Sequence, residues 1–144
     1  IRQAIHIAHA EGFSVMAHAN GAETVIAACE EKVDSIEHGA YLNEEALCAM
    51  AEAGTVWVPT LSTIGNLRGK GRFREEEVEK ILESAMKNVR RFAALGGLIA
   101  PGTDAGAWAV PHGSLTEYAL LLEALGEDTD AILEKGITVI REKF

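Results

Sequence analysis

The sequence contains few cysteines and no long apolar run. Only Cys29 and Cys48 occur among 144 residues, and each stands alone in a segment with a helical pattern. Isolated cysteines of this kind indicate buried, unpaired thiols in a reducing cytoplasm rather than a disulfide or a metal-binding pair. No apolar run approaches the roughly 20 residues of a membrane span, and residues 1–5 lack the pattern of a signal peptide. We therefore expect a cytoplasmic protein without a membrane segment.

Basic residues are scarce relative to acidic ones. The chain has 13 Lys and Arg against 22 Asp and Glu, which is a formal net charge of −9. A field of this sign repels nucleic acid and anionic lipid, so we expect neither as a partner. With 48% hydrophobic and 24% charged residues, the composition is typical of one soluble globular unit, and no linker divides residues 1–144 into separate domains.

Short apolar segments alternate along the chain with segments of helical periodicity. The order β, α, β, α predicts a parallel sheet with helices outside it. Asn43 is the expected N-cap of one helix and Gly54 its expected end. The strand-like segments are residues 13–18, 33–39, 55–61 and 98–104, and the helical patterns cover residues 1–12, 22–31, 43–53, 74–95, 115–125 and 128–140.

Three of the strand-like segments end in a side chain that can bind a metal ion. These side chains are His18, His38 and Asp104. The carboxyl ends of parallel strands meet at one edge of a sheet, so the three should converge, and imidazole with carboxylate suits zinc or a similar divalent ion. Each histidine taken alone could be an ordinary buried or loop residue, but the joint pattern favours a metal site.

Strand alternation also predicts which residues share a face with these ligands. His18 should lie on the face of Met16, and His38 on the face of Ile36. Glu37 then has the opposite parity to His38, so we expect it to point towards the helix layer. In that position it could still orient a neighbouring group around the metal.

Segments 15–21, 33–39, 58–61 and 102–106 carry a resemblance to a known family. In order and spacing they resemble the second half of the amidohydrolase superfamily, in the imidazolonepropionase-like and Xaa-Pro dipeptidase-like branch. The resemblance implies the C-terminal half of a (β/α)8 TIM-type barrel, strands five to eight with their helices. By the same resemblance His18 ends strand five, His38 ends strand six and Asp104 ends strand eight, while the strand at 55–61 carries no evident ligand.

The resemblance further implies a metal-dependent hydrolase acting on a C–N bond of a cyclic amide or dipeptide-like substrate. Zinc, or another divalent metal, would be bound by His18, His38 and Asp104. A bound zinc lowers the pKa of its water to about 7 and so makes hydroxide available at neutral pH. Asp104 would then accept the proton of that water and return it to the leaving amine.

Three further residues are candidate substrate contacts. His112 precedes Gly113 at a position after strand eight where the resembled family often has a His-Gly pair near the pocket. Arg68 and Arg72 lie in a glycine-rich segment, residues 62–72, that could form a mobile lid and contribute a cation to an anionic group of the substrate. The alternatives are an ordinary loop histidine and a solvated flexible loop. Specificity should depend on residues 62–72 and 105–113.

The chain also lacks parts that the resembled family has. A complete barrel needs roughly 250 residues, and no His-x-His pair of strand one or lysine of strand four is present. The flanking β-sandwich domain is missing too, and the chain does not begin with methionine. We therefore expect a fragment with two unpaired sheet edges, which would form homo-oligomers or bind the missing N-terminal half.

Two functions follow from these observations. The first is the catalytic C-terminal half of a metal-dependent amidohydrolase that is inactive by itself. The second is a non-catalytic half-barrel that serves as a structural or self-associating module.

Overall fold

The computed structural model describes residues 1–106 and 109–144. Residues 107 and 108, in one of the two loops where specificity was expected, lie outside the described part. Four strands form one sheet in the order β1-β2-β3-β4, and every pair is parallel. The strands are β1 (Met16–Ala19), β2 (Ser35–His38), β3 (Val56–Val58) and β4 (Leu98–Ile99). The predicted parallel α/β architecture is therefore confirmed.

Helices connect the strands and follow the last one, in the order that the periodicity predicted. The helices are α1 (Arg2–Ala10), α2 (Ala22–Cys29), α3 (Glu44–Ala53), α4 (Ser62–Gly65), α5 (Glu75–Ala94), α6 (Thr116–Leu125) and α7 (Thr129–Lys143), with a 3-10 turn at Gly126–Asp128. Asn43 caps α3 by accepting a hydrogen bond from the Ala46 amide, and Gly54 ends it in the left-handed conformation, both as predicted. The expected loop at 62–72 differs, because its first four residues form α4.

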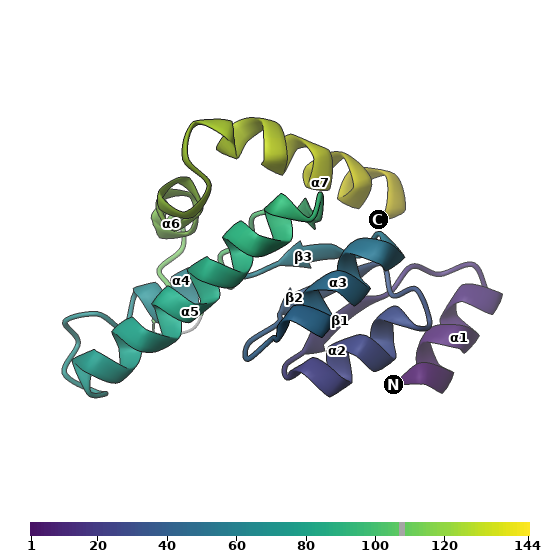
Figure 1. The fold of residues 1–144 in the computed structure, drawn as a ribbon, viewed down its shortest axis with the longest axis horizontal. Coiled ribbons are helices and arrows are strands. Elements are labelled where there is room, and N and C mark those ends of the chain that lie inside the picture. The colour runs from purple at the N-terminus through teal and green to yellow at the C-terminus, as the bar shows by residue number, and fades with distance from the viewer. Residues whose placement is uncertain (107–108) are drawn as a thin grey trace.

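The main core lies between the sheet and the helices on one side of it (Figure 1). Alternate strand residues point into this core, namely Ala17, Ala19, Ile36, Trp57 and Ile99. They form one cluster with apolar residues of the helices, such as Leu47 of α3, Ile64 of α4 and Phe92 of α5. Because a strand alternates its side chains, the residues between these face the opposite side of the sheet.

The opposite face of the sheet is covered unevenly. Val56, Val58 and Ala100 form a second apolar cluster with Val139 and Ile140 of α7. Met16 and His18 of β1, in contrast, are exposed. The helix α7 therefore covers the β3–β4 side of this face and leaves the β1 side open (Figure 1).

The free edge of β4 is covered as well, which corrects the expectation of two open edges. The Ala100 amide donates to the Trp57 carbonyl, so the carbonyl of Ile99 points away from β3. Gly136 of α7 packs on that carbonyl, and a β-carbon added at Gly136 would lie 2.1 Å from its oxygen. At the other edge of the sheet, β1 pairs with a strand on one side only, β2, within residues 1–106 and 109–144.

The two cysteines are unpaired thiols. Cys29 is buried and its pKa is raised by burial, against the effect of a hydrogen bond with Thr55. Cys48 is only partly buried, whereas a buried thiol was predicted. Among the described helices, none has the length and apolarity to cross a membrane.

Candidate functional site

The candidate site lies at the carboxyl ends of the strands, where three residues that are not glycine have positive φ angles. His38 ends β2 with φ 70°, Thr60 follows β3 with φ 49°, and Asp104 follows β4 with φ 51°. Positive φ is uncommon outside glycine and is particularly unfavourable for a β-branched residue such as threonine. Such strain persists only where surrounding contacts hold it, and it is concentrated at functional sites.

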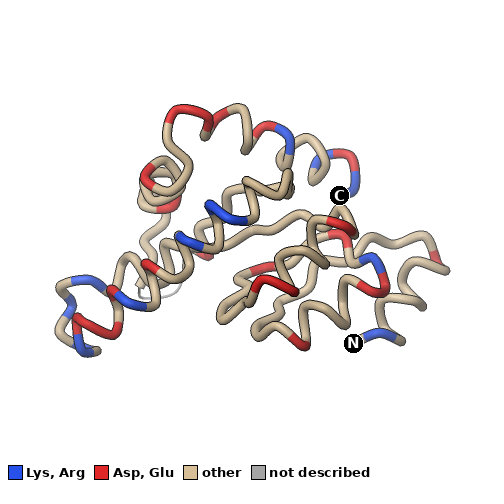
Figure 2. The backbone as a smooth tube through the Cα atoms, viewed as in Figure 1, with Lys and Arg blue, Asp and Glu red and all other residues tan. Residues whose placement is uncertain are grey.

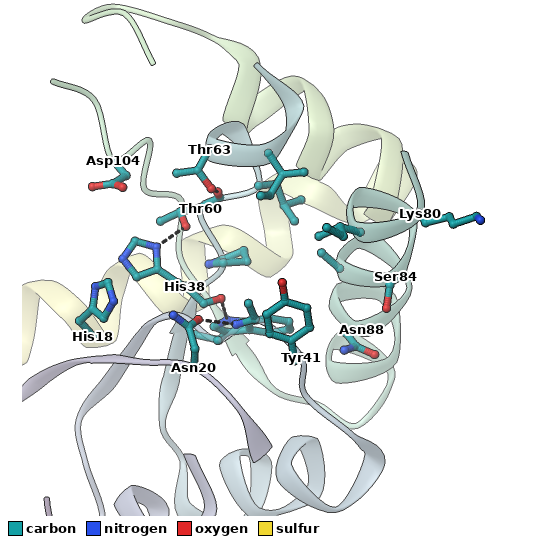
Figure 3. Close-up of a pocket in the computed structure, with 18 residues that line it drawn as sticks. His18, Asn20, His38, Tyr41, Thr60, Thr63, Lys80, Ser84, Asn88 and Asp104 are labelled. Carbon is teal, nitrogen blue, oxygen red and sulfur yellow. Dashed lines mark hydrogen bonds between the residues drawn. The ribbon is translucent and has the colours of Figure 1, made fainter. Parts of the chain in front are cut away.

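The two candidate histidines are in contact. The ring centroids of His18 and His38 are 4.3 Å apart at an interplanar angle of 64°. The Nδ1 atom of His38 forms a 2.7 Å hydrogen bond with Oγ1 of Thr60, and the indole of Trp57 donates to the His38 carbonyl (Figure 3). The ring and backbone of His38 are thus both held, and its Nε2 atom stays available for a ligand.

The surroundings of His38 favour the neutral form of its imidazole. Burial and the neighbouring His18 lower the pKa of His38, while Asp104 and Glu37 act in the opposite direction without cancelling the decrease. Only a neutral imidazole can bind a metal ion, so this direction favours ligation at neutral pH. Asp104 lines the same pocket as His18 and His38, and its carboxylate lies on their side of the pocket (Figure 3).

These residues fit a divalent metal as a partial ligand set. Two imidazoles in contact, one of them oriented through its other nitrogen, can supply two of the three or four protein ligands of a zinc site. No group of three His, Cys, Asp or Glu side chains is close enough to hold a metal ion within the described ranges. Asp104 therefore stands beside the histidine pair without completing a three-ligand cluster.

The face predicted for Glu37 is wrong. In the β1–β2 register His18 pairs with Glu37, and Ser35 donates a hydrogen bond to Glu37 from the same face. Ile36 instead packs in the main core against the helices. His38 leaves the face of Ile36 because its positive φ turns the chain at the strand end, which strand parity cannot anticipate.

A pocket of about 500 Å³ adjoins the histidine pair. It extends from His18, His38 and Asp104 towards α5, and its apolar walls include Tyr41, Leu61, Ile64 and Ile81. Lys80, Ser84 and Asn88 line its α5 side (Figure 3). The periodicity of residues 74–95 predicts this helix, but it contains no signal that one face of the helix borders a pocket.

The predicted substrate contacts do not line this pocket. Arg68 forms an ion pair with Glu79 and lines a second cavity of about 350 Å³ between α5 and α6. Figure 2 shows that basic and acidic residues are interspersed in the segment between α4 and α5 and at the start of α5. Arg72 lies over the ring of Phe73, 5.7 Å from its centroid. His112 is exposed, and a β-carbon added at Gly106 would lie 3.7 Å from its Nε2 atom. All three stay predictions as substrate contacts.

Comparisons of sequence place the chain near uncharacterized proteins. It is 29% identical over 132 residues to an uncharacterized protein of Mycobacterium tuberculosis and to its counterpart in Mycobacterium bovis, an alignment that covers 88% of this chain and 35% of each relative. No family model matches the chain.

Comparisons of structure find hydrolases. A Xaa-Pro dipeptidase with bound methionine in its active site superposes with a TM-score of 0.77 at 27% identity, covering 99% of this chain and 38% of the dipeptidase. A putative prolidase from Bifidobacterium longum gives 0.76 at 26% identity, covering 97% of this chain and 39% of the prolidase. An amidohydrolase at 24% identity gives 0.78, covering 97% and 36%. This chain thus spans little more than a third of the length of the proteins it matches.

Proposed function

Because the chain has an amidohydrolase-like, dipeptidase-like fold over nearly its whole length, we propose that it forms strands five to eight of a metal-dependent hydrolase barrel. The reaction would be hydrolysis of a C–N bond in a dipeptide-like or cyclic amide substrate. The observation that carries the proposal is the contact between His18 and His38, with the Nδ1 atom of His38 held by Thr60.

Each residue of the site would have a distinct task. His18 and His38 would hold a divalent ion, zinc in the first instance, whose chemistry is to lower the pKa of water and to polarise a carbonyl. Asp104 would accept the proton of the attacking water and deliver it to the departing amine. The bond from Thr60 would keep the imidazole of His38 in one tautomer and orientation.

The lining of the pocket favours a substrate that has an apolar side chain. Tyr41, Leu61, Ile64 and Ile81 surround a space of about 500 Å³ that opens beside the histidine pair. A small set of polar groups among apolar walls is usual for small-molecule sites. The matched dipeptidase holds methionine, an apolar amino acid, in its own active site.

The rest of the ligand set would come from a preceding segment. The histidine pair and Asp104 do not make a three-ligand cluster by themselves in the part of the chain that the structure describes. The matched proteins are more than twice as long as this chain. A His-x-His strand and a strand-ending lysine in that additional length would complete the site.

The alternative, a non-catalytic half-barrel, is favoured by one observation. The helix α7 packs on Val56, Val58 and Ala100, on the face that would line the interior of a closed barrel, and also covers the edge of β4. Because α7 covers this face and the β4 edge, the chain could exist as a separate module.

Metal analysis of the purified chain tests the proposal. Zinc should co-purify with, or be taken up by, the parent chain, and a His18→Ala, His38→Ala double variant should lose it. A matched control replaces His6, an exposed histidine outside the pocket, by alanine, and it should keep the parent's zinc. Equal zinc in the parent and the His18, His38 variant, measured by plasma emission, would rule the site out.

A further inference from the structure

Glu117 of α6 is a buried carboxylate that the chemistry above does not use. Its side chain is among the most deeply buried in the protein, at 1% exposure. Its Oε2 atom accepts a 2.6 Å hydrogen bond from the amide of Ser62, while Oε1 has no partner among the described residues. Burying a carboxylate without an ion partner costs free energy. The hydrogen bond with Ser62 is the contact that this buried position provides.

Burial also affects the ionisation of this group. Loss of solvent raises the pKa of Glu117, and hydrogen bonds from Ser62 and from the Leu61 amide act against that increase. In either protonation state Oε2 can accept the bond from Ser62, because a neutral carboxylic acid retains a carbonyl oxygen. The contact with the residues after β3 therefore does not depend on charge.

Ser62 connects Glu117 to two parts of the candidate site. Its hydroxyl donates a 2.8 Å hydrogen bond to the carbonyl of Thr103, the residue before Asp104. Ser62 also follows Thr60 by two residues, and Thr60 binds the Nδ1 atom of His38. The turn between them is closed by the Thr63 hydroxyl, which donates to the Thr60 carbonyl.

The two residues reached through Ser62 are both strained. Thr60 and Asp104 have φ angles of 49° and 51°, values that cost energy for residues other than glycine. Their conformations require contacts from outside their own strands. Glu117 is 55 residues from Ser62 in sequence, and it supplies such a contact from a different helix.

We propose that Glu117 is a positioning residue: by anchoring Ser62, it holds Thr60 against His38 and sets the position of Thr103 and Asp104. The part of this inference that concerns metal affinity rests on the function proposed above. The part that concerns the orientation of His38 does not.

The test compares three variants of the 144-residue chain. Glu117→Leu removes the acceptor and nearly keeps the volume, Glu117→Gln keeps a carbonyl acceptor for Ser62, and Glu123→Leu is a matched control at an exposed position of the same helix. Zinc affinity is measured by competition with a chromophoric chelator. Nitrogen-15 NMR at a fixed pH reports the Ser62 amide and the tautomer of the His38 ring.

Glu117→Leu should weaken zinc binding by about tenfold to 100-fold, the usual effect of losing a contact that orients a ligand. It should also shift the Ser62 amide signal and move the His38 ring signals towards those of an unconstrained imidazole. Glu117→Gln should give parent-like values for all three readouts, and Glu123→Leu should change none of them. A purely structural role for Glu117 would alter stability without this recovery of the ring signals.

The outcomes separate the two proposals. If the parent takes up no zinc, the metal site fails and the His38 ring signals alone decide the role of Glu117. If Glu117→Leu keeps the parent's ring signals, the positioning role is overturned.

A second variant, Ser62→Ala, is used if Glu117→Leu does not fold. It deletes only the hydroxyl that binds the Thr103 carbonyl. Unchanged zinc affinity and unchanged Asp104 signals in that variant would overturn the inference.

Discussion

At the scale of single residues, the candidate site depends on a threonine with no metal-binding chemistry of its own. The strand at 55–61 was expected to contribute no ligand, and none of its side chains is a metal-binding type. Its contribution is Thr60, whose hydroxyl binds Nδ1 of His38 at 2.7 Å. Metal-binding histidines usually have such a partner on the second ring nitrogen, which sets the tautomer and orients the ring.

Thr60→Val should therefore weaken metal binding without removing a ligand. Valine has the shape of threonine and lacks only the hydroxyl, so His38 loses its partner while the strand end keeps its packing. We expect a decrease in zinc affinity of about tenfold or more, measured by chelator competition. Thr138→Val is the control, since the hydroxyl of this exposed residue of α7 donates to the Glu134 carbonyl and Thr138 does not line the pocket. Parent-like affinity in Thr60→Val would show that the hydrogen bond does not orient the ligand.

At the scale of elements, one buried carboxylate joins three segments at the amino end of the sheet. Asp34, with a side chain 4% exposed, accepts hydrogen bonds from His9 of α1, from the Val15 amide before β1 and from Lys143 of α7. Burial acts to raise the pKa of Asp34, but the hydrogen bonds from Lys143, His9 and Val15 outweigh it and the pKa is lowered. The charged form of Asp34 thus ties the first and last helices to the sheet.

Asp34→Asn should destabilise the chain in a pH-dependent manner. A hydrogen bond to a charged group contributes about 1.5–3 kcal/mol, so we expect a loss of that order in urea unfolding at neutral pH. Because the folded pKa is lowered, this stabilisation is complete above the unfolded carboxyl pKa of about 3.9 and disappears as pH falls through the lower folded value.

The expected result is a parent-to-variant difference that is constant near neutral pH and shrinks only in acid. Glu52→Gln, at an exposed carboxylate of α3, should match the parent at every pH. A difference for Asp34→Asn that persists unchanged in acid would mean that the charge of Asp34 does not contribute.

At the scale of the whole molecule, the two sides of the sheet are unequal. The β4 side is covered by α7, whereas β1 has a free edge and carries Met16, 50% exposed, on its uncovered face. Phe13, which precedes β1, is 68% exposed. Free strand edges next to apolar side chains tend to pair with another chain. Association with a second copy or with a preceding segment is therefore expected at β1.

The isolated chain should self-associate through the β1 side and have little hydrolase activity. Met16→Glu should shift it towards monomer, because a charge on the contact face opposes burial, whereas Leu122→Glu on the exposed side of α6 should not. Size exclusion with light scattering measures the mass, and an amidase assay follows on the same fractions. A monomeric parent would contradict the association. Turnover at about 1 to 1,000 per second, typical of enzymes, would contradict the need for a preceding segment.

The alternation of strands and helices, the ends of α3 and the positions of His18 and His38 at strand ends could all be predicted from the sequence. These features depend on local periodicity, on capping and on turn residues, all of which operate within a few residues. The parallel sheet followed from the same alternation. Asp104 was found in the same way, at the end of an apolar segment that begins after a glycine pair.

The contacts that hold these side chains could not be predicted from the sequence. The face of Glu37 could not be predicted, because the positive φ of His38 breaks the strand parity on which the prediction relied. The roles of Thr60 and Glu117 depend on contacts across 22 and 55 residues of sequence. The cover that α7 forms over β4 depends on Gly136 approaching a backbone carbonyl. Each of these features arises from packing between segments distant in sequence, for which local periodicity contains no signal.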